Sequence, residues 1–244
     1  MVRKIKKLYT IGDSWTYGDE LKNPKKECWP SVLSRELDCE LINQAAPAGP
    51  NDWMFRKTIE WVCTQKDVSN TLVIVAWSEP NRREENYKFI VYGKKLWYKV
   101  MKHFYNNELA YYKSICYMVT LQEFLKSRNV KYLFFQPWCD ILESEKKLQK
   151  VRDKKIKWLS NEKDEYQKEC YQEDLTIGNI IKEVDKKYVI GPRVLNYLNE
   201  YNLYTINSRS GNNDLGYPNR GHPNKKEHKI MAKFIKEKLI ELYS

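Results

Sequence analysis

Histidine is scarce in this sequence: of 244 residues, only His103, His222 and His228 are histidines. A general base or metal ligand that needs an imidazole must therefore come from one of three positions. The six cysteines form no Cys-x-x-Cys pair and have no histidine beside them, so donors with the spacing of a metal site are missing. We expect reduced thiols, no metal and no cofactor.

Long apolar runs are missing too. No stretch approaches the roughly 18 consecutive apolar residues of a transmembrane helix, so we expect no membrane span. The basic start of the chain is followed by only a short apolar run, which indicates a first strand and not a signal peptide. We therefore expect a cytoplasmic protein.

Composition is that of a globular protein, with 42% hydrophobic and 31% charged residues, and the length suits one α/β domain over residues 1–244. A net charge of +11 and 18 tyrosines make nucleic acid a conceivable partner. Lysine-rich usage follows equally from an AT-rich genome, and no nucleic-acid-binding motif occurs, so this partner is not favoured. The sequence does not indicate an oligomeric state.

Strand and helix patterns alternate along the chain, which predicts an α/β fold in three layers, a parallel sheet with helices on both faces. The expected strands are Lys7–Ile11, Glu40–Asn43, Leu72–Ala76, Lys131–Gln136 and Leu203–Asn207. The expected helices are Pro30–Leu37, Trp53–Thr64, about 109–126, and a last amphipathic helix that ends at Leu242. Two segments, about 84–108 and 143–187, have the character of insertions. The first is either a lid or a packed helical pair, and the second is predicted to be a solvated helical excursion.

A Gly-Asp-Ser segment, residues 12–14, directly follows the first predicted strand. A serine at the carboxyl end of a strand lies where open α/β sheets bind their ligands, and Gly12 allows a sharp turn there. Serine needs a base to become a nucleophile. His222, in the loop before the last helix, can reach the tip of a central first strand. His228 is expected to serve in packing or at the surface, and His103 has no partner pattern.

Three blocks of the sequence together resemble the SGNH (GDSL-type) hydrolase family, in the style of its phage- and virus-encoded members. They are residues 12–21, residues 43–52, and a final run that contains His222, Pro223, Asn224, His228 and Ala232. The resemblance implies a flavodoxin-like three-layer fold and a serine hydrolase.

The resemblance also implies roles for individual residues. Ser14 would be the nucleophile and His222 the base. The oxyanion donors would be the N–H of Ser14, the N–H of Gly49 or Ala48, and the side chain of Ser78 or Asn81. Asp13, Trp15 and Asn51 are further residues expected at the site. Independently of the resemblance, Trp138 is expected to border the pocket, because it follows the carboxyl end of a predicted strand.

This sequence departs from the family's usual pattern at the acidic residue of the catalytic triad. The aspartate that normally stands three residues before the histidine is replaced by Asn219, and Asp214 is the nearest acid upstream. Asn219 is favoured by position and Asp214 remains an alternative, so the orienting group could be uncharged.

The favoured function is therefore a serine esterase that acts through an acyl-Ser14 intermediate on a small-molecule or glycan ester, such as an O-acetyl group on a carbohydrate. One alternative is a catalytically weak scaffold that binds a glycan or nucleotide-like ligand. Another is a basic protein associated with nucleic acid.

Overall fold

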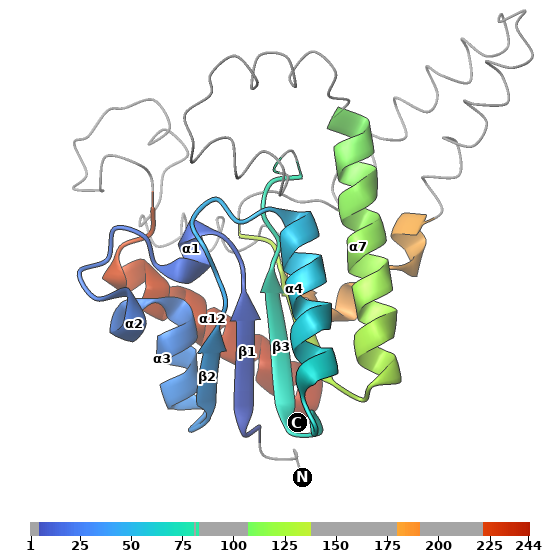
Figure 1. Ribbon diagram of the computed structural model, residues 1–244. Coiled ribbons are helices and arrows are strands. Elements are labelled where there is room, and N and C mark those ends of the chain that lie inside the picture. Colours follow the sequence, from blue (N-terminus) through green and yellow to red (C-terminus); the bar gives the residue numbers. More distant parts are fainter. Residues whose placement is uncertain (1–4, 81, 83–106, 138–179, 191–221) are drawn as a thin grey trace, which may run out of the picture.

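The computed structural model describes residues 5–80, 82, 107–137, 180–190 and 222–244. Its centre is a five-stranded parallel sheet in the order β2-β1-β3-β4-β5 (Figure 1). The strands are β1 (Lys7–Ile11), β2 (Glu40–Asn43), β3 (Thr71–Ala76), β4 (Lys131–Phe135) and β5 (Val189–Ile190). This is the flavodoxin-like order, in which the chain direction across the sheet reverses at β1, so the carboxyl end of β1 is a natural ligand position.

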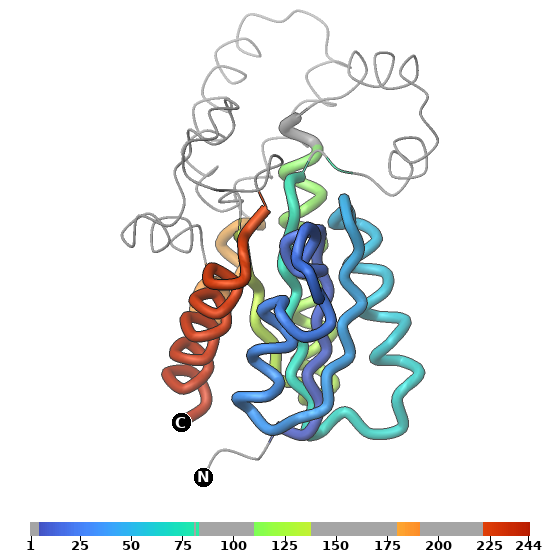
Figure 2. Tube along the Cα trace, turned by 90° about the vertical axis from the view of Figure 1, so that its left-hand side faces the viewer, coloured from blue at the N-terminus to red at the C-terminus, as the bar shows by residue number. Residues whose placement is uncertain are grey.

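Helices cover both faces of the sheet. They are α1 (Ser14–Tyr17), α2 (Pro24–Glu27), α3 (Trp29–Glu36), α4 (Asn51–Thr64), α7 (Asn107–Ser127) and α12 (Lys225–Tyr243), with short 3-10 turns η1 (Ile181–Glu183) and η2 (Lys186–Tyr188). Figure 2 shows α12 on the opposite side of the sheet from α4. The three layers predicted from the sequence are thereby confirmed.

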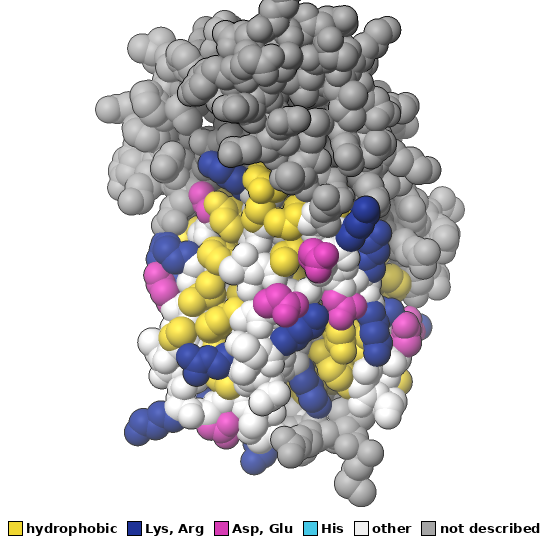
Figure 3. Space-filling model, turned by 90° about the vertical axis from the view of Figure 1, so that its right-hand side faces the viewer, with side chains coloured by type: hydrophobic (Ala, Val, Ile, Leu, Met, Phe, Trp, Pro, Cys, Tyr) yellow, Lys and Arg dark blue, Asp and Glu magenta, His cyan; other side chains and the backbone are white. Residues whose placement is uncertain are grey.

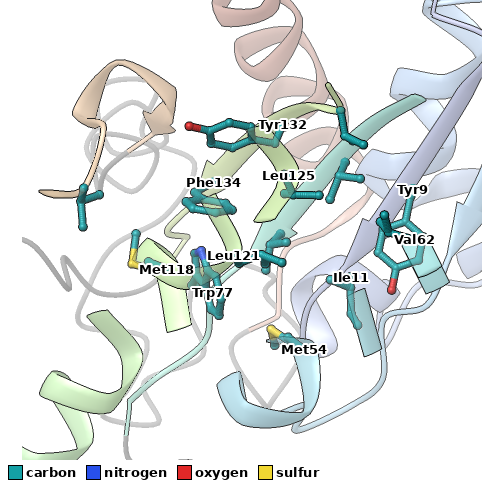
Figure 4. Packing of buried hydrophobic residues seen from close by; sticks show 14 of the residues in the cluster. Tyr9, Ile11, Met54, Val62, Trp77, Met118, Leu121, Leu125, Tyr132 and Phe134 are labelled. Carbon is teal, nitrogen blue, oxygen red and sulfur yellow. The ribbon is translucent and has the colours of Figure 1, made fainter. Parts of the chain in front are cut away.

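Alternate strand residues supply two separate cores, as the period of two in a strand requires. In β3, Leu72 and Ile74 pack in the cluster that includes α3 and α12, whereas Val73 and Val75 pack in the cluster that includes α4 and α7. Figure 4 shows the second cluster, in which Trp77 lies close to residues of α7 and β4. Because both faces of β3 are buried, its sequence is apolar at every position but the first.

The face that carries α4 and α7 is shown in Figure 3. Lysine and arginine side chains there are interspersed with aspartate and glutamate. Among the charged residues of α4 and α7, Lys57 pairs with Glu60 and Lys126 pairs with Glu123. The described part of this face therefore presents mixed charge. None of the described helices combines the length and the apolar character needed to cross a membrane.

Four of the predicted strands and all four predicted helices are confirmed, with ends that shift by at most a few residues. The fifth described strand is Val189–Ile190, which was not predicted from the sequence, and residues 203–207 lie outside the described part. Of the predicted insertion at 143–187, residues 180–187 are described, and Ile181 and Val184 within them are buried in the core. The end of that segment is thus partly buried, while its residues 182, 183, 186 and 187 are exposed. The predicted insertion at 84–108 lies outside the described residues apart from its last two.

Candidate active site

Ser14 lies in a tight turn at the carboxyl edge of the sheet. Asp13 caps α1 by accepting a hydrogen bond from the Trp15 N–H at 3.1 Å, and Ser14, 6% exposed, is the first residue of that helix. The helix ends after one turn at Gly18, whose φ is +87°. The N–H groups of Gly18 and Asp19 both donate to the Ser14 carbonyl, at 2.9 and 3.0 Å. The serine and the residues after it therefore form one compact unit.

Gly12 is needed for space and not for an unusual backbone angle. It does not have a positive φ, so the expectation that its conformational freedom makes the turn is corrected. A Cβ at this position would collide with the Thr16 side chain and would lie 2.9 Å from the Cβ of Ala76, at the end of β3. The missing side chain lets α1 lie directly against the sheet.

Asp13 joins this turn to the segment that follows β3. Its buried carboxylate accepts hydrogen bonds from the Ser78 Oγ and from an Arg82 guanidinium nitrogen, both at 2.9 Å. A buried carboxylate is costly unless a cation and hydrogen bonds compensate it, and Arg82 supplies the charge. Arg82 was not among the site residues expected from the sequence.

Asn51, at the start of α4, braces the same segment. Its amide oxygen accepts from the Ser78 N–H at 2.8 Å, and its amide nitrogen donates to the Ser78 carbonyl at 3.0 Å and to the Ser114 hydroxyl at 3.1 Å. Because the Ser78 hydroxyl donates its single proton to Asp13, it can reach an oxyanion only by giving up that bond. In this conformation Asn51 and Ser78 support the site from the interior.

The loop before α4 lies against the turn of Ser14. The Ala46 N–H donates to the Gly12 carbonyl at 3.1 Å, and the Gly49 N–H donates to the Ala46 carbonyl at 3.0 Å. Ala48 has a φ of +57°, which is uncommon for a residue with a side chain. Within the part of the chain that is described, the N–H groups of Ser14 and Ala48 have no hydrogen-bond partner. Of the two expected loop donors, Ala48 is therefore the one whose N–H is available.

His222 lies just ahead of α12, beside the residues that follow α1. Its Nδ1 is 3.3 Å from Glu20 Oε1, and its Nε2 is 4.0 Å from Asp19 Oδ2. The side chain of His222 is 14% exposed. His222 and Ser14 are over two hundred residues apart in sequence. The Asp19–Glu20 segment connects them, because it contacts the His222 ring and is hydrogen-bonded to the Ser14 carbonyl.

The start of α12 is fixed in three ways. Asn224 caps the helix and forms a reciprocal capping box with Glu227. Lys225 pairs with Glu27 of α2 at 2.7 Å, and His228 Nδ1 accepts from the Trp29 N–H at 3.0 Å. Figure 1 shows this end of α12 beside α2 and α3. These contacts limit where His222, two residues before the cap Asn224, can lie.

His228 was expected either in packing or at the surface. It is a packing residue. It is fully buried, and burial, reinforced by the neighbouring His222 and opposed by Glu27, lowers its pKa from 6.5 to about 3. It is therefore neutral at physiological pH and serves as a hydrogen-bond acceptor for α3.

The remaining expected site residues divide into two groups. Trp15 is buried in the core with Trp29 and Met231, away from any surface. The others, namely Asn81, Trp138, Asp214 and Asn219, lie outside the described residues, as does His103, for which no site role was expected. The choice between Asn219 and Asp214 as orienting group stays a prediction.

Comparisons with known proteins agree with the fold. Residues 18–92 match a family model described as a family of unknown function (DUF6071). A search of curated proteins finds no match. Among solved structures, the psychrotrophic esterase EstA from Pseudoalteromonas sp. is similar at 11% identity with a TM-score of 0.50, over 97% of this chain and 98% of that chain.

Two further solved structures are similar at lower TM-scores. An acetyl xylan esterase, AlAXEase, has 14% identity and a TM-score of 0.49, over 95% of this chain and 98% of that chain. A lipolytic protein of the G-D-S-L family from Desulfitobacterium hafniense DCB-2 has 15% identity and a TM-score of 0.44, over 96% of this chain and 99% of that chain. At these identities, what the comparisons show is the fold, which this chain shares with EstA.

Proposed function

We propose that this protein is a serine esterase of the SGNH type that acts through an acyl-Ser14 intermediate. The observation that carries the proposal is the position of His222 beside the Asp19–Glu20 segment, whose main chain is hydrogen-bonded to Ser14. The fold shared with an esterase and the three sequence blocks support the same reading.

In the proposed reaction the Ser14 hydroxyl oxygen attacks the acyl carbon while His222 takes its proton. The imidazolium then returns the proton to the leaving alcohol, the ester C–O bond breaks, and an acyl-Ser14 ester remains. Water, deprotonated by His222, attacks this ester in a second step of the same kind and releases the acid. No step needs a redox partner.

The negative oxygen of each tetrahedral intermediate needs hydrogen-bond donors. We assign the N–H groups of Ser14 and Ala48 to this role, because the Gly49 N–H and the Ser78 hydroxyl are engaged in internal hydrogen bonds. One such donor is worth about 10²–10³ in kcat in other hydrolases. These two main-chain donors by themselves would give a working but slow enzyme, and Asn81, outside the described residues, stays the expected side-chain donor.

Acetyl is the acyl group that needs the least room beside Ser14, which is 6% exposed. A small-molecule or carbohydrate acetyl ester is therefore the first substrate class to test. A series of p-nitrophenyl esters, from acetate to octanoate, should show the highest kcat/KM for the shortest acyl chain.

The proposal is tested with p-nitrophenyl acetate and three proteins: wild type, Ser14→Ala and His222→Ala. We expect each variant to lose about 10³-fold or more in kcat/KM, because each removes one member of a unit that acts together. Equal turnover by wild type and Ser14→Ala would remove Ser14 from the chemistry.

A catalytically weak scaffold that binds a glycan or nucleotide-like ligand is the second candidate. The engaged Gly49 N–H and Ser78 hydroxyl favour it, because among the described residues they leave only the N–H groups of Ser14 and Ala48 as oxyanion donors. A fluorophosphonate probe separates the two, since an unactivated serine would stay unmodified.

A further inference from the structure

Two acids, Asp19 and Glu20, lie beside the His222 imidazole, and neither was expected there from the sequence. We infer that Glu20 is the acid that orients His222, in place of the aspartate that would normally stand three residues before it. This inference rests on the proposed function, in which His222 is the base. Glu20 would be a positioning residue that acts through the imidazole.

The two ring nitrogens distinguish the two acids. In a Ser-His-acid arrangement the acid accepts from Nδ1–H, which leaves Nε2 to take the serine proton. Glu20 Oε1 lies 3.3 Å from Nδ1, whereas Asp19 Oδ2 lies 4.0 Å from Nε2. Glu20 is therefore at the nitrogen where the orienting acid belongs.

Burial favours the same assignment. His222 Nδ1 is buried and has no hydrogen bond within the described residues. A buried polar atom without a partner costs about 1–3 kcal/mol, so a small rotation that completes the bond to Glu20 would stabilise the site. The side chain of Glu20 is 18% exposed against 38% for Asp19, so water screens Glu20 less. Catalytic hydrogen bonds in free enzymes are often long and tighten when substrate binds.

The backbone at Glu20 gives an independent observation. Its φ is +68°, in the left-handed region where glycine or asparagine would be expected. Unfavourable backbone angles of this kind cluster at functional sites. Here the unfavourable angle belongs to the residue whose carboxylate lies against His222 Nδ1.

The same turn connects Glu20 to the nucleophile. The Asp19 N–H donates to the Ser14 carbonyl at 3.0 Å, and the Leu21 N–H donates to the Gly18 carbonyl at 3.3 Å. The residues before and after Glu20 are thus tied to the helix that begins with Ser14. Nucleophile and orienting acid would come from one short segment, with the base supplied from the far end of the chain.

Charge completes the argument. When His222 takes the Ser14 proton it becomes an imidazolium, which a carboxylate stabilises and the uncharged Asn219 does not. The other imidazole nearby, His228, is held neutral by burial and adds no competing positive charge. The Glu20 carboxylate therefore supplies the charge that the substitution by Asn219 removes.

The test compares Glu20→Gln with Asp19→Asn, a matched loss of the other carboxylate beside the same ring. For p-nitrophenyl acetate we expect Glu20→Gln to lower kcat about 10²- to 10⁴-fold with little change in KM, because the imidazole takes the wrong tautomer. Asp19→Asn should stay within about threefold of wild type, as for other exposed charges. Glu20→Asp should recover part of the loss. Equal kcat values for Glu20→Gln, Asp19→Asn and wild type would overturn the inference.

A second readout does not depend on turnover. With only three histidines, ¹⁵N NMR of the imidazole nitrogens can be assigned by means of a His222→Gln variant. At a pH where the ring is neutral, we expect the Nδ1–H tautomer of His222 in wild type and in Asp19→Asn, and a shift toward Nε2–H in Glu20→Gln. If Ser14→Ala matched wild type in turnover, the proposed function would fail, yet this readout would still decide the Glu20–His222 pairing. An unchanged His222 tautomer in Glu20→Gln would refute the pairing.

Discussion

The substitution His228→Asn tests how the helix that follows His222 is held in place. His228 is fully buried and accepts a hydrogen bond from the Trp29 N–H at 3.0 Å. Burial lowers its pKa to about 3, so the folded protein keeps it neutral well below neutral pH. The oxygen of an asparagine side chain can accept the same hydrogen bond but does not titrate. A comparison of wild type with His228→Asn therefore isolates the effect of protonating His228.

The magnitude follows from the two pKa values of His228. The unfolded chain protonates this residue near pH 6.5 and the folded protein only near pH 3, so the unfolded state binds more protons between them. The stabilising contribution is complete above pH 6.5 and is lost as the pH falls toward about 3. Between pH 8 and pH 5 the expected loss is about 2 kcal/mol, and the whole shift corresponds to about 5 kcal/mol.

Urea unfolding at both pH values, followed by tryptophan fluorescence, measures this loss. We expect the free energy of unfolding of wild type to fall by about 2 kcal/mol more than that of His228→Asn on going from pH 8 to pH 5. Each protein is compared with itself, so the different helix propensities of histidine and asparagine cancel. Equal losses in the two proteins would refute the buried, neutral state of His228.

Three further substitutions test the framework of the site and of the sheet that carries it. Asn51→Ala should destabilise the protein by about 2–4 kcal/mol, because it leaves the buried N–H and carbonyl of Ser78 without partners. A loss under about 1 kcal/mol in urea unfolding would contradict the proposed brace. Tyr243→Phe removes a hydroxyl that donates to the Tyr132 carbonyl and accepts from its N–H, so we expect a loss of about 1–3 kcal/mol, and an unchanged urea midpoint would argue against it. Gly12→Ala should cost about 1–3 kcal/mol and lower esterase activity, since the new Cβ would lie 2.9 Å from the side chain that ends β3; a variant with wild-type melting temperature and rate would show that the turn can shift.

Much of the fold could be predicted from the sequence because the central strands are apolar at nearly every position. A strand such as Thr71–Ala76 is buried on both faces, and its composition alone indicates this. Val189–Ile190 could not be predicted in the same way, because two residues are too few to form a pattern. It belongs to the sheet because it pairs with Phe134 and Phe135 of the neighbouring strand.

The site was only partly predictable, for a different physical reason. Local motifs identified Ser14 and His222 as candidates, but side-chain bonds across the fold determine what the residues around them do. Asn51 was expected to border the site. Its side chain is hydrogen-bonded to the main chain of Ser78, 27 residues away in sequence. Glu20 had no local signal, because an orienting acid was expected just before the histidine and not after the serine.

The most direct test of the central claim is covalent modification of Ser14. Wild type is incubated with a fluorophosphonate, and the modified residue is identified by intact mass and peptide mapping. We predict one adduct, on the peptide that contains Ser14, none in Ser14→Ala, and a strongly reduced labelling rate in His222→Ala. Absence of an adduct in wild type, or equal labelling of wild type and Ser14→Ala, would contradict a serine activated by His222.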